Sequence, residues 1–211
     1  LDTAYLDYDV IGVKNAGERE MLEVLLVAGR KDMVDSFLQV LLKARLKPRE
    51  IEVLPLTLLR FLRREEGQQV VAAVDVARGV TNMVIADAGK PRLARMMPSG
   101  LTVMERQAAA TREEGMGDAT EGMERERLVV NIQATIGFYQ SHKEARPVEK
   151  ILLSGTGSRG AGLVEGLRAR LGLPVKRVNP AEVLGLKVAG FSGEEFVDFS
   201  LAASLACRGW E

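Results

Sequence analysis

The sequence predicts an α/β fold, and three observations support this class. Strand-length apolar runs alternate with helical periodicity between residues 22 and 62. Three strand-length segments follow one another between residues 70 and 97, and a strand, a glycine turn, a helix and a strand follow in order across residues 150–178. Alternating strands and helices are typical of α/β sheets, so we expect parallel pairing in part of the molecule.

The first 62 residues predict two strands and two helices. The opening segment "LDTAYLDYDVIGVK" is typical of a strand already under way, and the short apolar run 22–28 has the length of a buried strand. Apolar residues at three- and four-residue steps predict a helix over 31–45, which Pro48 prevents from continuing. A second strand is expected at 51–54 and a short helix at 56–62, giving a β-α-β-α order that favours parallel pairing.

The next part of the chain predicts a three-stranded meander and a long helix. The polar run 65–69 is the expected boundary between two lobes, and the strands are expected at 70–76, 82–86 and 92–97, with a hairpin bend at "DAGKP". Residues 111–126, rich in glycine and charge, predict either a loop or a helix interrupted by glycine. Residues 124–143 predict an amphipathic helix, whose apolar face consists of Leu128, Ile132, Ile136 and Tyr139.

The last part predicts a βαβ unit followed by a helix. Strands are expected at 150–153 and 175–178 around a helix at 163–171, and the final helix at 194–208 is expected to bury Phe196, Phe199, Leu201 and Leu205. We expect Cys207 to be a small core residue and His142 to be a solvated residue at a helix end.

Composition excludes several classes of function. Lys plus Arg and Asp plus Glu both number 29, so the net charge is zero, and we expect no nucleic acid partner. No apolar run approaches the roughly 18 residues of a membrane span. One cysteine and one histidine are too few ligands for a metal site made of these residue types. With no second histidine, the chain also lacks the residues for a catalytic triad other than one built on His142. A single cysteine also fits a reduced, cytoplasmic setting.

Two turns are candidates for ligand binding. In the first, Asp75 ends a strand, and Thr81 and Asn82 begin the next, so that a carboxylate, a hydroxyl and backbone N–H groups converge. Such a turn can hold a phosphate, with Asp75 acting through a metal-bound water. It can equally be a plain hairpin.

The second candidate is the glycine turn "SGTGS", which lies between a strand and a helix. Its glycines let the backbone approach a phosphate or a flat ring, and the positive end of a following helix attracts anions. Such a turn can also serve packing alone.

The order of these motifs resembles the second half of the actin-like ATPase (ribonuclease H-like) fold. The segments "YLDYDVIG", "VDVARGVTNMVI", "IQATIGFYQSH", "KILLSGTGSRGAGLVEGLRARLGLPVKRVNP" and "FSLAASLACRG" together resemble PilM, the family of actin-like proteins of type IV pilus assembly. The cell-division protein FtsA and the cytoplasmic part of the type II secretion protein GspL are its relatives. The resemblance covers nearly the whole chain.

The resemblance implies a partial fold. Residues 1–64 would be the remainder of an inserted small subdomain and the end of the first lobe, and residues 65–211 the complete second lobe, with a helical insert at about 98–148. No segment matching the family's first phosphate turn precedes Leu1. We therefore expect a fragment that binds ATP poorly by itself.

The resemblance also implies an ATP and Mg site. Its residues would be Asp75, Thr81, Asn82, Gly155, Thr156, Gly157 and Ser158, with Asp75 reaching Mg through water. Ala77 and Val80 depart from the family's phosphate turn, where a glycine and a hydroxyl residue are usual.

Members of this family bind the amino-terminal cytoplasmic peptide of PilN, a membrane protein, and other proteins of the pilus platform. The resemblance thus implies a cytoplasmic scaffold, peripheral to the inner membrane through its partners, with part of the peptide groove near residues 22–42. Efficient catalysis is not expected, although the full-length parent is compatible with weak ATPase activity. Two alternatives remain open. One is a small-molecule kinase of the same fold with Asp75 as base, and the other is a cytoplasmic domain like that of GspL.

Overall fold

The computed structural model describes residues 3–16, 19–62, 67–101, 116–187 and 195–208. These residues form two compact units, Leu1–Glu52 and Val53–Glu211. The division between the units falls after Glu52, whereas the sequence predicts a boundary between two lobes at residues 65–69. Residues 65 and 66 of that predicted boundary lie outside the described ranges. The division into actin-like lobes remains a prediction.

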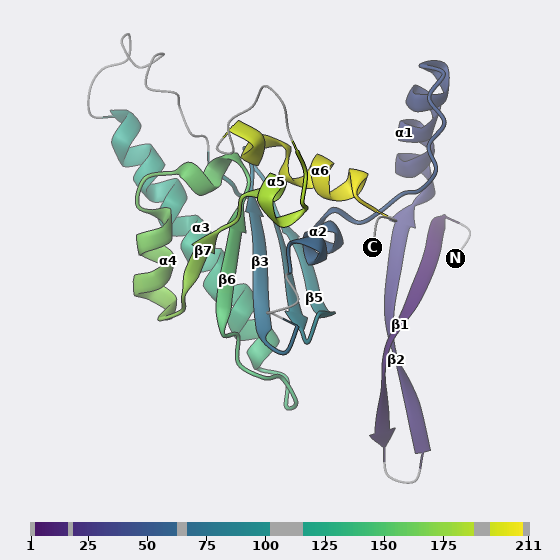
Figure 1. Cartoon of the computed structure of the whole chain (residues 1–211), viewed down its shortest axis with the longest axis horizontal. Coiled ribbons are helices and arrows are strands. Elements are labelled where there is room, and N and C mark those ends of the chain that lie inside the picture. The colour runs from purple at the N-terminus through teal and green to yellow at the C-terminus, as the bar shows by residue number, and fades with distance from the viewer. Residues whose placement is uncertain (1–2, 17–18, 63–66, 102–115, 188–194, 209–211) are drawn as a thin grey trace. The chain divides into compact units, whose positions relative to one another are not determined.

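The first unit consists of a hairpin and one helix. Strands β1 (Ala4–Ala16) and β2 (Arg19–Arg30) pair antiparallel, with a shift in register between Val10 and Gly12. Helix α1 (Lys31–Lys43) follows β2 directly and ends before Pro48, as the periodicity predicts. Figure 1 shows α1 continuing beyond the end of the hairpin.

Three predictions for this part of the chain are wrong. The run 22–28 is a strand, but its residues are exposed or half-buried because β2 has a single neighbouring strand. Residues 51–53 form no strand. The parallel pairing expected from the β-α-β-α order is replaced by the β1–β2 hairpin, since the first strand and the run 22–28 are joined by a short turn.

The second unit is built on a five-stranded mixed sheet in the order β5-β4-β3-β6-β7. Strands β3 (Val70–Val76), β4 (Thr81–Asp87) and β5 (Lys90–Met97) form the predicted meander, whose second turn has positive φ angles at Ala88 and Gly89. Strands β6 (Lys150–Ser154) and β7 (Val175–Arg177) run parallel to β3, which confirms the predicted βαβ unit around α4 (Leu163–Leu171).

Helices cover both faces of this sheet (Figure 1). On one face, α3 (Met116–Gln140) and α4 pack against alternate residues of β3, and the predicted apolar face of α3 is buried. Residues 116–126 are helical, while residues 111–115 of the expected loop or helix lie outside the described part. On the other face, α2 (Leu54–Thr57) and the 3-10 helix η1 (Leu58–Phe61) pack against Val71 and Ala73.

The end of the chain differs from the prediction in its buried face. A short 3-10 helix, η5 (Glu195–Phe199), precedes α6 (Ser200–Ala206), so the helical phase shifts within the segment. Phe199 and Leu205 are exposed, whereas Ser200, Ala203, Ser204 and Cys207 are buried. Cys207 is thus a core residue as expected, and His142 is exposed after the end of α3. The short helix α5 (Pro180–Val183) completes the unit, with Asn179 accepting hydrogen bonds from the Ala181 and Glu182 N–H groups.

Candidate functional site

The two candidate turns meet at the carboxyl ends of β3 and β6. These strands are parallel neighbours, so both turns follow strand ends at the same edge of the sheet. Asp75 is the register partner of Asn82 on β4 and of Ser154 on β6. Because paired residues share a face of the sheet, the three side chains emerge on the same side, the one that carries α2 and η1. The residues expected to form a site are brought together.

Asp75 is a buried carboxyl group in this cluster. Only 2% of the residue is exposed, and the Ser154 Oγ donates a hydrogen bond of 2.8 Å to Asp75 Oδ2. Burial raises the pKa of Asp75 to about 6, and the Ser154 hydrogen bond opposes this shift. The group therefore exchanges its proton close to neutral pH.

Asn82 brings a polar group with spare hydrogen-bonding capacity. The residue is buried, and neither its Nδ2 nor its Oδ1 has a hydrogen-bond partner among the residues that the structure describes. A buried polar group without a partner costs about 1–3 kcal/mol. The amide next to Asp75 therefore fits a bound polar group, and it supports the inclusion of Asn82 in the expected site.

Thr81 and the turn after β3 are held by residues 99 and 100. The Thr81 hydroxyl donates to the Ser99 carbonyl oxygen at 2.7 Å, so its proton is already engaged. The Ala77 N–H donates to the Val80 carbonyl and closes the turn. Gly100 packs so closely that a Cβ there would overlap the Ala77 carbonyl oxygen and lie 2.7 Å from the Val80 nitrogen. On this side, residue 100 covers the turn that was expected to cradle phosphate.

The glycine turn after β6 packs against the end of β3. Gly155 has φ of +82°, and a Cβ there would lie 2.5 Å from the Val76 carbonyl oxygen and 2.9 Å from Asp75 Oδ2. The Gly155 N–H donates to the Ser200 Oγ at 3.4 Å. Gly157 and Ser158 are buried, while Thr156 is partly exposed. Packing therefore accounts for Gly155, and Thr156 is the member of the turn most accessible to a ligand.

The helix after the glycine turn lies where the sequence predicts it, since α4 begins at Leu163. A short 3-10 helix, η4 (Thr156–Arg159), which was not predicted, lies between the strand and α4. The glycines that follow β6 also allow the chain to form this tight 3-10 turn before α4 begins. The positive end of α4 therefore does not begin at the turn.

Three residues that shape the site are not among the expected site residues, although Ser154 belongs to the candidate turn "SGTGS". Ser154 binds Asp75, Ser200 accepts the Gly155 N–H, and Gly100 backs the first turn. Two of them could have been found in the sequence. Ser154 ends the strand before the glycine turn, and Gly100 belongs to the turn-forming segment "PSG" that follows a predicted strand. Ser200 had no such signal, because its contact is made only by the fold.

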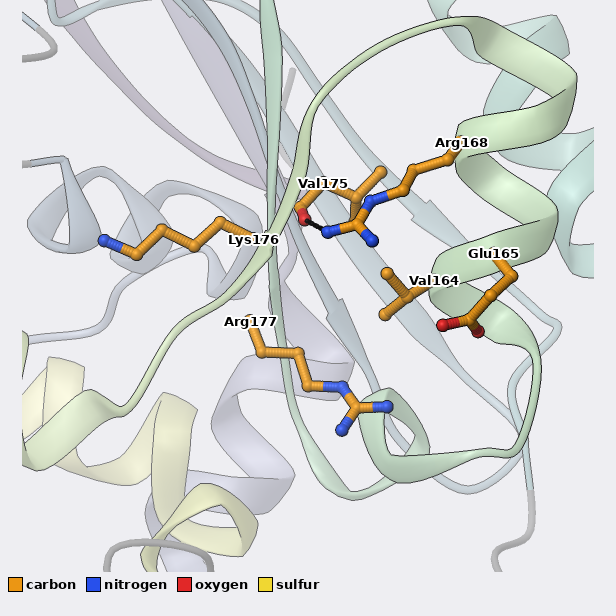
Figure 2. A pocket seen from close by; sticks show the side chains of 6 residues that line it. All are labelled: Val164, Glu165, Arg168, Val175, Lys176 and Arg177. Atoms are coloured by element: carbon orange, nitrogen blue, oxygen red, sulfur yellow. Dashed lines mark hydrogen bonds between the residues drawn. The ribbon is translucent and has the colours of Figure 1, made fainter.

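A surface hollow lies elsewhere, between α4 and β7 (Figure 2). Its volume is about 480 Å³, and it is lined by Val164, Glu165, Arg168, Val175, Lys176 and Arg177. The Arg168 Nη2 donates to the Val175 carbonyl oxygen at 2.8 Å, while Lys176 extends to the other side of β7 in this view. None of the expected site residues lines this hollow.

Two kinds of feature are absent from the described residues. These residues contain no group of three or more His, Cys, Asp or Glu side chains arranged to hold a metal ion, and Asp75 stands alone as the carboxylate of its cluster. The helices in these ranges include none that is long and apolar enough to cross a membrane.

Comparison with solved structures identifies the fold. A chain of a PilM–PilN type IV pilus biogenesis complex matches with a TM-score of 0.80 and 23% identity, covering 100% of this chain and 68% of that one. MreB5 of Spiroplasma citri bound to ADP matches with a TM-score of 0.53 and 9% identity, over 85% of this chain and 66% of that one. A protein of Bacteroides thetaiotaomicron with an actin-like ATPase fold and unknown function gives 0.49 and 13%, over 99% and 61%.

The mixed sheet and the two matches with TM-scores of 0.80 and 0.53 define a protein of the actin-like ATPase fold, as the sequence predicts. The family model of the type IV pilus assembly protein PilM matches residues 1–111. The chain therefore belongs to the PilM family of type IV pilus assembly proteins. Comparison with curated protein sequences gives no significant match.

Proposed function

We propose that this protein is a cytoplasmic scaffold of the inner-membrane platform that assembles type IV pili. In this role it binds the amino-terminal cytoplasmic peptide of a PilN-like membrane protein, which holds it at the membrane, and contacts other platform proteins. The observation that carries the proposal is the family match over residues 1–111, a range that includes the entire first unit.

The first unit offers an apolar surface suited to such a peptide. On α1, Met33, Phe37 and Val40 are 50%, 68% and 65% exposed and recur at four- and three-residue steps, so they form one stripe along the helix. Val34, Leu38 and Leu41 are only partly exposed. The exposed stripe lies near residues 22–42, where the resemblance implies part of the groove, and its apolar side chains are exposed enough to contact apolar residues of a peptide.

Fluorescence anisotropy tests this proposal with the labelled amino-terminal peptide of the PilN-like protein from the same source. The wild-type chain should bind, and Phe37→Glu should weaken binding by at least about tenfold because a charge would enter an apolar contact. Phe138→Glu is the matched control, since Phe138 is 57% exposed on a helix of the second unit. Absence of binding by the full-length parent would refute the scaffold role, and equal effects of both variants would refute the assignment to α1.

A second role, binding of ATP with Mg, is favoured by the buried and unpartnered amide of Asn82 beside Asp75. Asn82 and the turn at residues 155–158 would contact the nucleotide, with Thr156 the most accessible member. Asp75 would hold Mg through water. When bound, Mg would neutralise phosphate charge.

Calorimetric titration with Mg-ATP tests this second role. We expect weak binding that Asn82→Ala abolishes and Asn179→Ala leaves unchanged, because Asn179 caps α5 instead. Binding that Asn82→Ala leaves unchanged would refute the assignment of the nucleotide to this site. ATP turnover that requires Asp75 and a small-molecule acceptor would favour the kinase alternative instead.

A further inference from the structure

The tip of the first candidate turn carries a positive charge. Val76 of β3 pairs with Thr81 of β4, so Arg78 and Gly79 lie at the centre of the turn that joins these strands. Arg78 is exposed, and its guanidinium has no hydrogen-bond or ion-pair partner among the described residues. It follows Asp75, whose carboxyl group is buried at the candidate site, by three residues. The first turn therefore presents a cation that is available to an anionic ligand.

Other groups of this turn that could hold a phosphate are covered or already bonded. A Cβ on Gly100 would lie 2.7 Å from both the Gly79 and the Val80 nitrogen atoms, so Gly100 leaves no room for a phosphate against these atoms on its side of the turn. The Thr81 hydroxyl donates to the Ser99 carbonyl oxygen. By contrast, a Cβ on Gly79 would meet no atom within 4 Å, so there is space beside the tip. A phosphate that approaches this turn therefore meets the side chain at its tip.

The second candidate turn offers no comparable charge. Its one arginine, Arg159, forms an ion pair of 2.7 Å with Asp198. Asp75 would repel an anion whenever its carboxyl group is ionised. A polyphosphate at this site therefore needs a positive charge from elsewhere. An arginine suits this purpose well, because its planar guanidinium can donate two parallel hydrogen bonds to phosphate oxygens.

We propose that Arg78 binds the polyphosphate of the nucleotide and supplies part of the positive charge that the site needs. This contact rests on the second proposed role, the binding of ATP, to which it adds a side chain of the first turn. ATP should then bind in the absence of Mg as well as in its presence. Its affinity should depend on salt, because ions screen the attraction between an exposed guanidinium and a phosphate.

Titration of the chain with ATP in EDTA, followed by the NMR signals of the backbone amides, measures such weak affinities. Arg78→Gln should raise the dissociation constant by at least about tenfold, because charge-assisted hydrogen bonds to phosphate are lost. Arg78→Lys keeps the charge and should retain part of the affinity. Lys90→Gln is the matched control: Lys90 is an exposed cation beside the other turn of the meander, at the opposite end of β4, and its replacement should leave binding unchanged.

Salt separates a phosphate contact from a structural role. The wild-type affinity should fall more steeply with NaCl concentration than that of Arg78→Gln, and equal dependences would overturn the proposal. Equal affinities of the wild type and Arg78→Gln, or equal losses in Arg78→Gln and Lys90→Gln, would overturn it too. The amide spectra show whether each variant is folded.

The same titrations distinguish this contact from the binding role on which it rests. Absence of ATP binding by the wild-type chain, with and without Mg, would refute that role and the contact together. Binding that Asn82→Ala abolishes and Arg78→Gln leaves intact would refute the contact alone.

Discussion

Asp75 is a buried side chain whose ionisation is opposed by its burial. Its raised pKa of about 6, against 3.8 for the unperturbed group, corresponds to about 3 kcal/mol. The folded state binds the proton more tightly than the unfolded state between these pKa values, so the contribution of Asp75 to stability falls as pH rises from about 4 to about 6. Above that range the carboxylate is ionised, and the full free-energy cost of burying its charge lowers the stability of the folded protein.

Asp75→Asn should therefore stabilise the protein at neutral pH. We expect the free energy of unfolding to rise by about 1–3 kcal/mol at pH 7.5, with little change near pH 4, because asparagine is neutral and keeps an acceptor for Ser154. Urea denaturation of both proteins at the two pH values measures the difference. Asp9→Asn, at an exposed position, is the control. A variant less stable than wild type at pH 7.5 would contradict the argument.

Gly155 is required for a different physical reason, which is the close approach of two turns. Gly155→Ala should lower the free energy of unfolding by at least about 2 kcal/mol, because its Cβ would meet the Val76 carbonyl oxygen at 2.5 Å and φ is +82°. Gly172→Ala provides the comparison: it shares a positive φ but would meet no atom within 4 Å, so only about 1 kcal/mol is expected. Equal losses in denaturant titrations would remove the case for packing at Gly155.

At the scale of elements, Arg168 anchors the edge strand β7 to α4. Arg168→Met should lower stability by about 1 kcal/mol, because the hydrogen bond to the Val175 carbonyl would be lost while the alkyl part of the side chain is kept. Arg177→Met is the matched control, since its guanidinium makes no hydrogen bond to the described residues and it lines the same hollow. Thermal unfolding of both variants measures the difference. A larger loss for Arg177→Met would refute the anchoring role.

The elements that could be predicted are those whose own residues carry a turn signal or an apolar stripe. The meander is signalled by "DAGKP", and α3 by an apolar stripe that is indeed buried. The run 22–28 shows the limit, because an apolar strand has the same composition whether it lies inside a sheet or in an open hairpin. The final segment failed because a change from 3-10 to α-helix rotates the buried face.

For the candidate site, the sequence predicts which residues lie together, but not their burial or their hydrogen bonds. Asp75, Asn82 and the glycine turn could be paired because parallel strands bring their ends to one edge. The burial of Asp75 and the missing hydrogen-bond partners of Asn82 could not be predicted, because both depend on how segments far apart in the chain pack, as the bond from Ser154 to Asp75 illustrates.

At the scale of the whole molecule, the two units differ in what stabilises them. All of the buried apolar residues in the described ranges belong to the second unit, where two clusters fill the two faces of one sheet. The described part of the first unit has none. Stability of the sheet should therefore not depend on the first 52 residues, because burial of apolar area is the main favourable term in folding.

A chain reduced to residues 53–211 should keep its cooperative unfolding transition. We expect its midpoint temperature to lie within about 5 °C of that of the whole chain, which corresponds to about 1–2 kcal/mol for a domain of this size. Differential scanning calorimetry measures both transitions at the same protein concentration. Residues 1–52 alone should show no cooperative transition, because no described residue among them is buried and a two-stranded hairpin is marginally stable by itself. Loss of the transition from the 53–211 chain would mean that the first unit supplies part of the stability of the sheet.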